Sequence, residues 1–465
     1  MPRRQRAREP SPGADYIAFD FDDAPAPQDE NKRAEVIDDT VREHASARST
    51  PWARDIAWHE CKNVAEMLHR EVAAYNSWIA PTKEEHTCRR MIIRLLQHVI
   101  CEQWPDADVR SFGSQDTQLY LPQGDIDIVV LSQDMESRSR EVVLRQLASC
   151  LRFHNLATDI QVIARAKVPI IKFVCTYGRF NVDISINQAN GLQAAHFIDR
   201  WIAREPAIRP LVRVVKQLLQ QRSLSEVFTG GLGSYSVTLL VLSFLQLHPK
   251  LQRGEIIASH NLGVLLMDLL ELYGKNFGYD ECGISVKRGG AYFSKRTRGY
   301  EPKKPFLLCI EDPHDSSNDI SRGSFAIIAV RSAIGGAFDI LQAALCERAN
   351  DLQSFRRRQR ILHQGMGQRE HIRFGEEHTA SDNKEPESLL GSVLGVSREM
   401  TKRRHEIRRL FDSGVLQEQI ARMTGVPVPR GIDAITALLN TKPGTKADPN
   451  TAAAESVDSE SDAQT

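Results

Sequence analysis

The chain has 465 residues, 41% of them hydrophobic, which is more than one ordinary domain holds and enough to bury a substantial core. Its 60 basic and 60 acidic side chains cancel, which argues against an overall electrostatic grip on nucleic acid, so any polyanion site has to be local. The 8 cysteines form no Cys-x-x-Cys pair or Cys/His cluster, and apolar runs such as 237–247 fall short of the roughly 20 residues of a membrane span. We therefore expect two folded domains in a soluble, non-secreted protein with reduced thiols.

Both ends of the chain differ in composition from the middle. Residues 1–50 open with "MPRRQRAR" and have no apolar periodicity, which predicts a disordered tail. Over 351–465 we expect a mostly disordered tail with short helices, one of them around "KRRHEIRRLF" at 402–411, and an acidic end. We interpret the basic clusters at 356–360 and 402–409 as solvated helix faces rather than RNA-binding sites.

Helical periodicity flanks a mixed segment. Apolar residues recur at helical spacing between 91 and 100, and Pro105 ends the pattern, which predicts one long amphipathic helix. Helical spacing returns at 211–219 and at 235–248, where Pro249 ends it.

The mixed segment contains strand candidates, and Gly178-Arg179 fits a two-residue hairpin turn between the last two of them. The order predicts a small α+β domain followed by a helical one. The predicted elements are strands at 125–131, 170–177 and 180–186 and a helix at 139–152.

Three aspartates are the candidate catalytic residues. Asp125 and Asp127 face the same side of their predicted strand, because residues two apart share a face. Like charges this close raise one another's pKa unless a cation neutralises them, and hard oxygen ligands suit Mg²⁺ or Mn²⁺. Asp183 alternates with apolar residues in the strand at 180–186, so we expect it on the polar face. Together these three carboxylates can hold two metal ions.

A Gly-Ser pair precedes the aspartates. Gly113 lets the backbone approach a ligand closely, Ser114 is a good N-cap, and we predict a short helix at 117–120. Free N–H groups at a helix start bind phosphate oxygens. A phosphate cradle beside a carboxylate metal site is what nucleotidyl transfer requires.

Taken alone, an Asp-x-Asp or a Gly-Ser is more often a solvated turn or strand end. Their order here, with a third aspartate after a hairpin, resembles the polymerase-β-like nucleotidyltransferase superfamily. Longer segments resemble the non-canonical poly(A) polymerases that serve as catalytic subunits of TRAMP-type RNA-surveillance complexes, over most of 77–341. These segments include "RSFGSQDTQLYLPQGDIDIVVLS", "NVDISINQANGLQAA", "FTGGLGSYSVTLLVLSFLQLHP" and "IEDPHDSSNDISRGSFAII".

The resemblance implies a domain organisation. A nucleotidyltransferase catalytic domain at 106–200 would lie beside a helical central domain, the poly(A) polymerase-associated domain, at 201–350. The active site would occupy the cleft between them. The N-terminal helices at 51–105 would pack with the central domain.

The resemblance also implies roles for individual residues. Asp125 and Asp127 would bind both metal ions, and Asp183 would help to activate the RNA 3′-hydroxyl for attack on the α-phosphate of ATP. Without the resemblance, Lys216 is more often a solvated surface lysine, Tyr235 has the alternative of a buried structural tyrosine, and Asn190 could equally be a turn residue, so these alternatives stay open. The nucleotide-binding residues that the resemblance implies are Gly113, Ser114, Asn190, Lys216, Ser234, Tyr235 and Asn318.

Asn318 stands where terminal uridylyltransferases of the family tend to carry a histidine, which favours adenylate addition. We therefore expect a template-independent, metal-dependent RNA 3′-end adenylyltransferase that oligoadenylates nuclear non-coding or aberrant RNAs for exosome processing or decay. The alternatives are a terminal uridylyltransferase and a catalytically silent scaffold, and the three intact aspartates speak against the scaffold. One departure is Gly124, because the family often has serine before the first metal aspartate.

The resemblance further implies partners. The family commonly takes RNA affinity from a zinc-knuckle protein and works with an RNA helicase, so we expect both in a TRAMP-like complex that acts with the nuclear exosome, and no membrane. The basic "PRRQRAR" near the N-terminus fits a nuclear localisation signal. We expect the protein in the nucleus, the nucleolus included.

Overall fold

The computed structural model describes residues 49–165, 168–300, 303–363 and 388–440. The predicted tail at 1–50 lies outside these residues except for its last two, as does the acidic end of the chain. Two hydrophobic cores organise the described residues, one against a β-sheet and one within a set of helices. This arrangement confirms the predicted α+β class.

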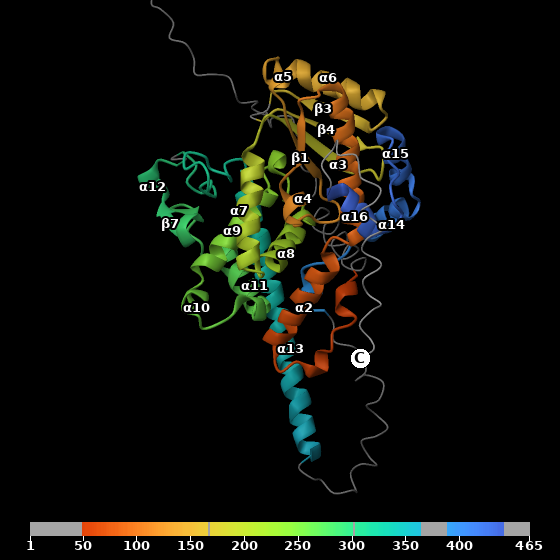
Figure 1. Ribbon diagram of the computed structural model, residues 1–465. Helices are drawn as coiled ribbons and strands as arrows, with labels where there is room; N and C mark the ends of the chain where they lie inside the picture. The colour runs from red at the N-terminus through yellow and green to blue at the C-terminus, as the bar shows by residue number, and fades with distance from the viewer. Residues whose placement is uncertain (1–48, 166–167, 301–302, 364–387, 441–465) are drawn as a thin grey trace, which may run out of the picture. The chain divides into compact units, whose positions relative to one another are not determined.

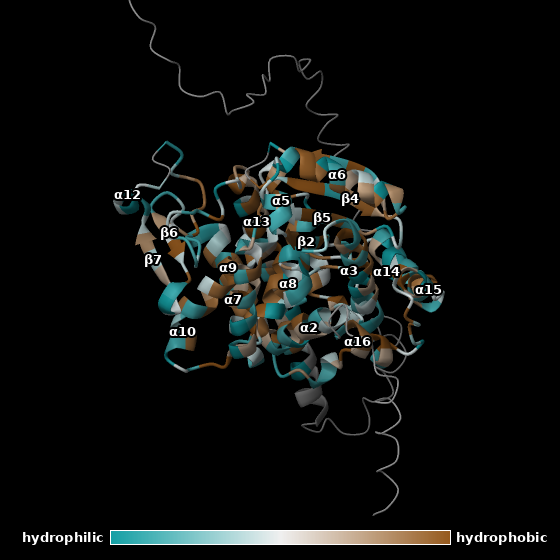
Figure 2. Cartoon of the chain, turned by 45° about the horizontal axis from the view of Figure 1, so that its top comes forward, coloured by the Kyte–Doolittle hydropathy of each residue, from teal (hydrophilic) through white to brown (hydrophobic). Residues whose placement is uncertain are grey.

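A five-stranded mixed sheet carries the candidate catalytic residues (Figure 1). Its strand order is β1-β2-β5-β4-β3, in which β2 and β5 run parallel and the other neighbours antiparallel. Much of the sheet is brown in Figure 2, which colours each residue by its hydropathy. The strands are β1 Asp108–Ser111, β2 Ile126–Leu131, β3 Ala157–Ile163, β4 Ile170–Cys175 and β5 Asn181–Ile186. The three predicted strands are thus confirmed as β2, β4 and β5.

The two outer strands escaped prediction because neither alternates clearly. β1 has four residues, and of these only Val109 is buried. In β3 only Ala157 is buried, and the register with β4 shifts between Thr158 and Gln161, where Asp159 has a φ of 54°. An edge strand with a bulge needs no regular apolar face, so its sequence carries little strand signal.

The hairpin between β4 and β5 differs from its prediction. Cys175 and Phe180 are the last residues paired across the hairpin, because the Cys175 N–H donates to the Phe180 carbonyl at 2.7 Å. The turn therefore consists of four residues, 176–179, rather than two. Gly178 and Arg179 both have positive φ, 67° and 51°, as a tight reversal requires. The longer turn moves the register by two residues and thereby places Lys172 opposite Asp183.

Helices α3 Lys83–Gln103 and α6 Arg140–Phe153 share the sheet core and confirm the predictions at 91–100 and 139–152. The Thr82 side chain caps α3 by accepting from the Glu85 N–H at 3.1 Å. Contrary to the expectation for 51–105, α3 packs on the sheet because its apolar stripe faces β-strand residues. Helix α2 Val64–Ile79, in contrast, packs with helices of the central segment.

The central segment is mainly helical and holds the second core. Helix α8 Ile208–Gln220 contains the predicted stretch at 211–219, and α9 Ser234–Leu247 matches the stretch predicted at 235–248 except for its last residue. A small hairpin, β6 Cys282–Ser285 with β7 Ala291–Ser294, lies near α12 Lys295–Arg298 (Figure 1). The helices of this segment are α7 Asn190–Arg204, α8 Ile208–Gln220, α9 Ser234–Leu247, α10 Pro249–Gln252, α11 Leu262–Glu271 and α13 Ile327–His363.

One stretch of the described helices, Ile327–Ser354 of α13, is long and apolar enough to cross a membrane by length and composition. Its residues Ile327, Val330, Ile334 and Leu341 are buried in the central core at helical spacing. This is the pattern of a helix that lays one face on a protein core, and we interpret α13 in that way.

The C-terminal segment 388–440 differs from the predicted tail. Helices α14 Arg398–Asp412, α15 Val415–Thr424 and α16 Ile432–Asn440 pack on α3 (Figure 1), and Ile407, Leu416 and Ile420 are buried in the sheet core. The helix predicted at 402–411 is confirmed. Its arginines are not simply solvated, because the guanidiniums of Arg403 and Arg404 stack on Phe180 and Trp78 at 4.5 and 4.7 Å.

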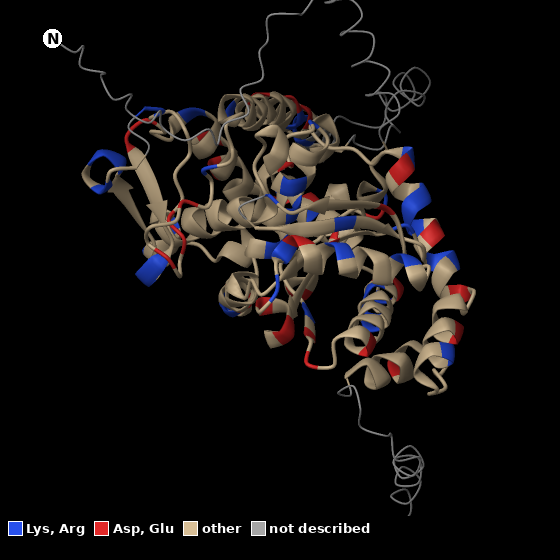
Figure 3. Ribbon diagram, turned by 90° about the horizontal axis from the view of Figure 1, so that it is seen from above, with Lys and Arg blue, Asp and Glu red and all other residues tan. Residues whose placement is uncertain are grey.

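Charged side chains of both signs are interspersed along the helices in Figure 3, as the equal counts in the sequence suggest. A short helix of the sheet region is α5 Gln133–Glu136, capped by Ser132.

Candidate active site

The three predicted aspartates lie together at one end of the parallel pair β2 and β5. Asp127 and Asp183 are direct register partners across the two strands. Asp125 immediately precedes β2, and the Asn181 side-chain amide donates to its Oδ1 at 3.2 Å. Because residues two apart share a face, Asp125, Asp127 and Asp183 all belong to the polar face of the sheet.

The carboxylates are close enough to perturb one another. Burial, together with the charges of Asp183 and Asp125, raises the pKa of Asp127 to about 7 against the opposing effect of Lys216 and Lys172. Burial also raises the pKa of Asp183, although Lys172 Nζ lies 2.8 Å from its Oδ2. Asp127 is therefore a partly buried carboxylate that lacks sufficient positive charge.

The chemistry of this donor set fits a divalent cation. Carboxylate oxygens are the ligands that Mg²⁺ and Mn²⁺ prefer, and a cation beside Asp127 would relieve the repulsion that raises its pKa. As the side chains stand, no three His, Cys, Asp or Glu residues in the described part of the chain converge on one metal position. Lys172 Nζ lies 2.8 Å from Asp183 Oδ2 instead, so a metal ion would compete with this ion pair for the Asp183 carboxylate.

Gly113 and Ser114 border the carboxylates, though not in the predicted way. Helix α4 Ser114–Thr117 begins at Ser114, with Gly113 as the N-cap and no side-chain cap, and Gln118 ends it in the left-handed conformation. The short helix predicted at 117–120 is thus wrong, because the turn starts one residue after the glycine. Gly113 has a φ of 68°, and a Cβ there would lie 3.1 Å from Asp127 Oδ2. Only glycine allows this backbone to approach the carboxylate so closely.

Lys216 lies on α8 and turns toward the same site. Its Nζ donates to the Leu119 carbonyl at 2.7 Å. Burial lowers the pKa of Lys216 to about 8, with Arg213 and Arg89 adding to this effect and the Asp127 carboxylate opposing it. Lys216 is therefore a partly buried cation beside the carboxylates rather than the solvated surface lysine of the alternative reading.

Arg89 on α3 holds the turn that delivers Asp125, and the sequence reasoning missed it. Its fully buried guanidinium donates to the carbonyls of Gly124 at 2.8 Å and Asp125 at 3.3 Å. The same group stacks over the rings of Tyr120 at 4.1 Å and Phe180 at 4.9 Å. The signal that could have found it is an arginine within the apolar stripe of a helix, since a buried charge requires partners.

Gly124 itself has little room for a side chain. A Cβ at this position would lie 3.1 Å from the Leu121 carbonyl and 3.2 Å from Tyr120 Cβ. The departure from the family's serine therefore accompanies a tightly packed turn in this chain.

Two cavities meet at Asp127. The larger, of about 410 Å³, is lined by Asp125, Asp127, Asp183 and Lys216, and the smaller, of about 260 Å³, by Gly113 and Tyr235. Three residues line both, so the two cavities form one continuous site on either side of a carboxylate: Ser114, Asp127 and Ser234.

Ser234 and Tyr235 open α9, as predicted, with Gly233 as its N-cap. The Tyr235 hydroxyl is buried and has no hydrogen-bond partner among the residues that the structure describes. Burial, together with the charge of Asp312, raises the pKa of Tyr235. A buried hydroxyl without a partner at a cavity wall is what a ligand-binding side chain presents before its ligand arrives.

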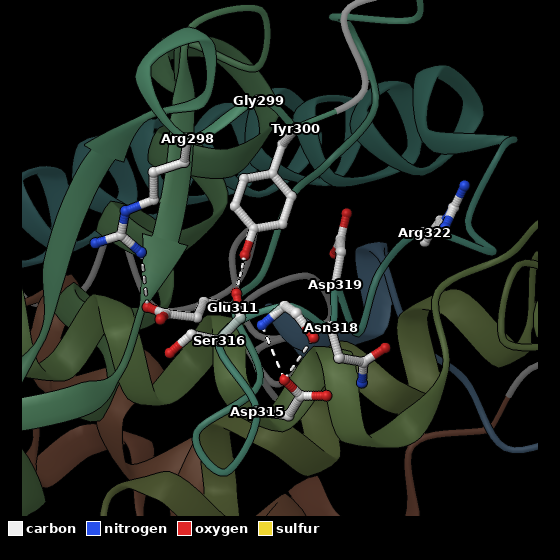
Figure 4. A pocket seen from close by; sticks show the side chains of 10 residues that line it. Arg298, Gly299, Tyr300, Glu311, Asp315, Ser316, Asn318, Asp319 and Arg322 are labelled. Atoms are coloured by element: carbon white, nitrogen blue, oxygen red, sulfur yellow. Dashed lines mark hydrogen bonds and ion pairs between the residues drawn. The ribbon is translucent and has the colours of Figure 1, made fainter.

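Asn318 and Asn190 lie apart from the two cavities. Asn318 lines a third, polar pocket of about 900 Å³ together with Arg298, Tyr300 and Glu311 (Figure 4). Its amide donates to Asp312 Oδ2 at 2.9 Å, and Asp312 is also the charge that acts on Tyr235. Asn190 is exposed at the start of α7 and lines none of the three cavities. The structure therefore brings all the predicted residues except these two to one continuous site.

Comparisons with known proteins fit this geometry. Residues 68–203 match the family described as poly(A) RNA polymerase, mitochondrial-like, central palm domain, and residues 261–318 match the Cid1 family poly A polymerase. Poly(A) RNA polymerase CID14 of Cryptococcus neoformans var. neoformans serotype D is 42% identical over 401 residues, which are 86% of this chain and 50% of the relative. The chain spans about half the length of this curated relative and of others like it.

In two further matches, this chain covers most of the length of the matched protein. The inactive non-canonical poly(A) RNA polymerase protein Trf4-2 of Drosophila melanogaster is 36% identical over 58% of this chain and 67% of the relative. A solved structure of the polymerase core of TRAMP, an RNA surveillance complex, matches with a TM-score of 0.62 and 39% identity, over 74% of this chain and 99% of that one. From the site geometry and these matches together, the chain belongs to the family of non-canonical poly(A) RNA polymerases.

Proposed function

We propose that this chain is a template-independent polymerase that uses ATP and divalent metal ions to add adenylates to RNA 3′ ends. One observation carries the proposal: Asp125, Asp127 and Asp183 share the polar face of two parallel strands, at the wall of a cavity that also holds Lys216. Three acidic groups beside a cation suit a substrate that brings both phosphate and metal.

The reaction joins the RNA 3′-oxygen to the α-phosphorus of ATP. The bond from that phosphorus to the β-phosphate breaks, pyrophosphate leaves, and the hydroxyl proton passes to a base. Asp183, whose pKa is raised by burial, is the candidate proton acceptor, and Asp125 and Asp127 hold the metals. Divalent cations, when bound, neutralise phosphate charge and make the hydroxyl more acidic.

Positive charge and free N–H groups suit the triphosphate. Lys216 lies beside Asp127 and is well placed to contact phosphate oxygens, and Ser234 lies at the start of a 14-residue helix whose first N–H groups lack intrahelical partners. Tyr235, with its unpaired hydroxyl, lies on the other side of Asp127 and suits the base and sugar of ATP.

The inactive Drosophila relative makes catalysis the question to settle. A scaffold has no need to keep Asp127 buried against two other carboxylates, because the arrangement costs stability unless a cation compensates it. The mutually repelling aspartates thus favour an active enzyme over a silent one.

The RNA-surveillance role, the partners and the location are also proposals. The likeness to the polymerase core of TRAMP, an RNA surveillance complex, supports a TRAMP-type complex. A zinc-knuckle RNA-binding protein, a helicase and the nuclear exosome are the partners that the sequence resemblance implies. Nuclear localisation rests on the basic segment near the N-terminus, and a fluorescent reporter fused to residues 1–50 tests it. Retention of that reporter in the cytoplasm would remove this part of the proposal.

The deciding experiment is extension of a short oligoadenylate RNA with each nucleoside triphosphate in turn, with Mg²⁺ or Mn²⁺. We expect extension with ATP above all, and none by the Asp125→Ala/Asp127→Ala variant. Preference for UTP would move the chain to the terminal uridylyltransferases. If no nucleotide is incorporated even with a zinc-knuckle partner present, the scaffold becomes the better description.

A further inference from the structure

The loop between α8 and α9 presents an aromatic ring at the mouth of the larger cavity. Phe228 is 94% exposed, within the 3₁₀ turn Val227–Thr229, and lines the cavity that contains Asp125, Asp127 and Asp183. Phe153 is exposed to a similar extent, 82%, but lies on α6, away from the three cavities described. Exposure alone is thus uninformative, and the place of Phe228 beside the carboxylates sets it apart.

The backbone that carries Phe228 is firmly held. The Gly230 N–H donates to the Val227 carbonyl at 2.9 Å, the Leu232 N–H to the Leu224 carbonyl at 2.8 Å, and the Ala326 N–H to the Gly230 carbonyl at 2.9 Å. These bonds tie the loop to itself and to the start of α13. Phe228 therefore occupies a fixed position at the cavity rather than the tip of a loose loop.

Small residues and apolar contacts hold the other side of this loop. Gly230, with a φ of 86°, lies so close to the Phe325 ring that a Cβ would come within 2.5 Å of it. A Cβ on Gly233 or Gly323 would lie 2.8 or 2.7 Å from the methyl groups of Val227. Val227 and Phe325, which are 47% and 58% exposed, make these close contacts, and the Phe228 ring faces solvent.

The ring lines the cavity that also contains Asp183, the carboxylate proposed to meet the RNA 3′-hydroxyl. Asp183 and Lys172 line the larger cavity with Phe228, whereas Tyr235 lines only the smaller one. Glu226, two residues before Phe228, acts electrostatically on both Asp183 and Lys172, so this loop borders the carboxylate that would meet the 3′-hydroxyl. An exposed ring next to that position has a face free for a nucleobase.

We propose that Phe228 is a stacking platform for a base at the 3′ end of the RNA primer, and that it positions the terminal hydroxyl at Asp183. This inference rests on the proposed function and adds the place where the RNA end binds. Stacking suits a polymerase that extends its own product, because an aromatic face accepts each new terminal base without needing a template. Phe228 is a substrate-binding residue in this scheme and takes no part in the proton transfer.

The test measures initial rates of oligoadenylate extension by the full chain while RNA and ATP are varied separately. We expect Phe228→Ala to raise the KM for RNA about 10-fold or more, the size of one lost base stack, while the KM for ATP stays within about twofold. Phe228→Trp is expected to keep wild-type values, since it retains an aromatic face. Phe153→Ala, a matched exposed phenylalanine, is expected to change neither KM.

A second arm places the stack on the primer. An RNA whose 3′-terminal nucleotide lacks its base is expected to weaken extension by the wild type and to abolish the difference between wild type and Phe228→Ala, whereas an abasic position far from the end leaves that difference intact. A Phe228→Ala enzyme with wild-type KM for RNA, or one that shifts the KM for ATP instead, overturns the inference. Failure of the wild type to extend any RNA overturns the proposed function itself, so the two failures are distinguishable.

Discussion

Asp127 at the catalytic face and Glu311 in the pocket of Figure 4 are both shielded carboxylates, but their surroundings differ. The pKa of Asp127 is raised to about 7, first by burial and then by the charges of two neighbouring carboxylates. Burial also acts to raise the pKa of Glu311, yet hydrogen bonds from Ser285, Ser316, Lys287 and Arg298 outweigh it and lower that pKa to about 2. Arg298 points directly at Glu311 in Figure 4, at 3.1 Å.

The difference teaches how to tell a structural carboxylate from a functional one. Glu311 carries its own cations and gains nothing from a ligand, so it stabilises the fold around the pocket. Asp127 stays uncompensated in the protein alone, and the missing positive charge has to come with the substrate. Replacement of Glu311 should therefore lower stability more than activity, and replacement of Asp127 should lower activity more than stability.

Removal of the catalytic carboxylates is expected to have the largest effect. Asp125→Asn/Asp127→Asn should lower the rate of ATP-dependent extension by about 10³-fold or more, because the loss of metal binding removes several kcal/mol of transition-state stabilisation. Without divalent cation its Tm should equal or exceed that of the wild type, since the buried repulsion at Asp127 is gone. Extension assays measure the rate, and thermal unfolding measures the Tm. A fully active variant would contradict the metal site, and a strongly lowered Tm would mean that these aspartates are structural.

Glu311→Gln is expected to show the reverse pattern. It leaves Lys287 and Arg298 facing an uncharged group, so the free energy of unfolding should fall by about 2–3 kcal/mol, with kcat/KM of the folded enzyme within about threefold of wild type. Urea unfolding monitored by circular dichroism measures the first and extension the second. Glu281→Gln, at an exposed glutamate near the same hairpin, is the matched control and should leave stability unchanged.

The effect of Glu311 should depend on pH in a defined direction. Because its pKa is lowered from 4.5 to about 2, the folded protein holds fewer protons than the unfolded chain between these values. The stabilisation is complete above about pH 5 and is lost as the pH falls toward 2. The difference in the free energy of unfolding between wild type and Glu311→Gln should therefore become smaller by about 1 kcal/mol from pH 7 to pH 4. A gap that widens in acid would contradict this account.

Lys216→Met should have an intermediate effect. It keeps the apolar stem but removes the cation beside Asp127, so kcat/KM for ATP should fall about 10- to 100-fold, the size of a charge-assisted contact to phosphate, while the KM for RNA changes little. Steady-state kinetics with each substrate varied separates the two. Lys250→Met, at an exposed lysine of α10, should behave as wild type. An RNA-specific defect in Lys216→Met would place the triphosphate elsewhere.

Much of the site could be predicted because side chains alternate between the two faces of a strand. The rest depends on contacts between residues that lie far apart in the sequence. Asp125, Asp127 and Asp183 were predictable because alternation assigns each to a polar face. Their meeting required β2 and β5 to be neighbours, which the resemblance supplied. Arg89 was not predictable as a functional residue, because its carbonyl partners at Gly124 and Asp125 lie 35 and 36 positions away in the chain.

The packing of the C-terminal helices on the sheet domain escaped prediction for a different reason, although the helix at 402–411 was predicted. In α14 only Met400 and Ile407 are buried, so the sequence has almost no apolar stripe. The helix is held instead by arginines, among them Arg404, which donates to the carbonyls of Trp78 at 2.6 Å and Ala80 at 3.1 Å. Such contacts look like surface charge until the partner segment is known, which is why the tail was expected to be mostly disordered.

The ion pair between Lys172 and Asp183 belongs to the comparison of compensated and uncompensated carboxylates, and its expected effect is the smallest. A two-residue turn would have placed Lys172 opposite Ser185, and only the four-residue turn at 176–179 sets it 2.8 Å from the third carboxylate. Because Lys172 is 40% exposed, the pair should contribute less than about 1 kcal/mol to stability.

Lys172→Gln should therefore change metal dependence more than stability. A cation would compete with this ion pair for the Asp183 carboxylate, so removal of the pair should lower the Mn²⁺ concentration for half-maximal extension by up to about fivefold, with kcat little changed. Titration of Mn²⁺ at saturating ATP and RNA measures this, and Arg179→Gln, which removes an exposed arginine of the same hairpin, serves as the control. If Lys172→Gln instead needs more Mn²⁺, then Lys172 acts as a support for the bound state of Asp183 rather than as a competitor of the metal. In that case the catalytic face would carry part of its own compensating charge, as the Glu311 pocket does.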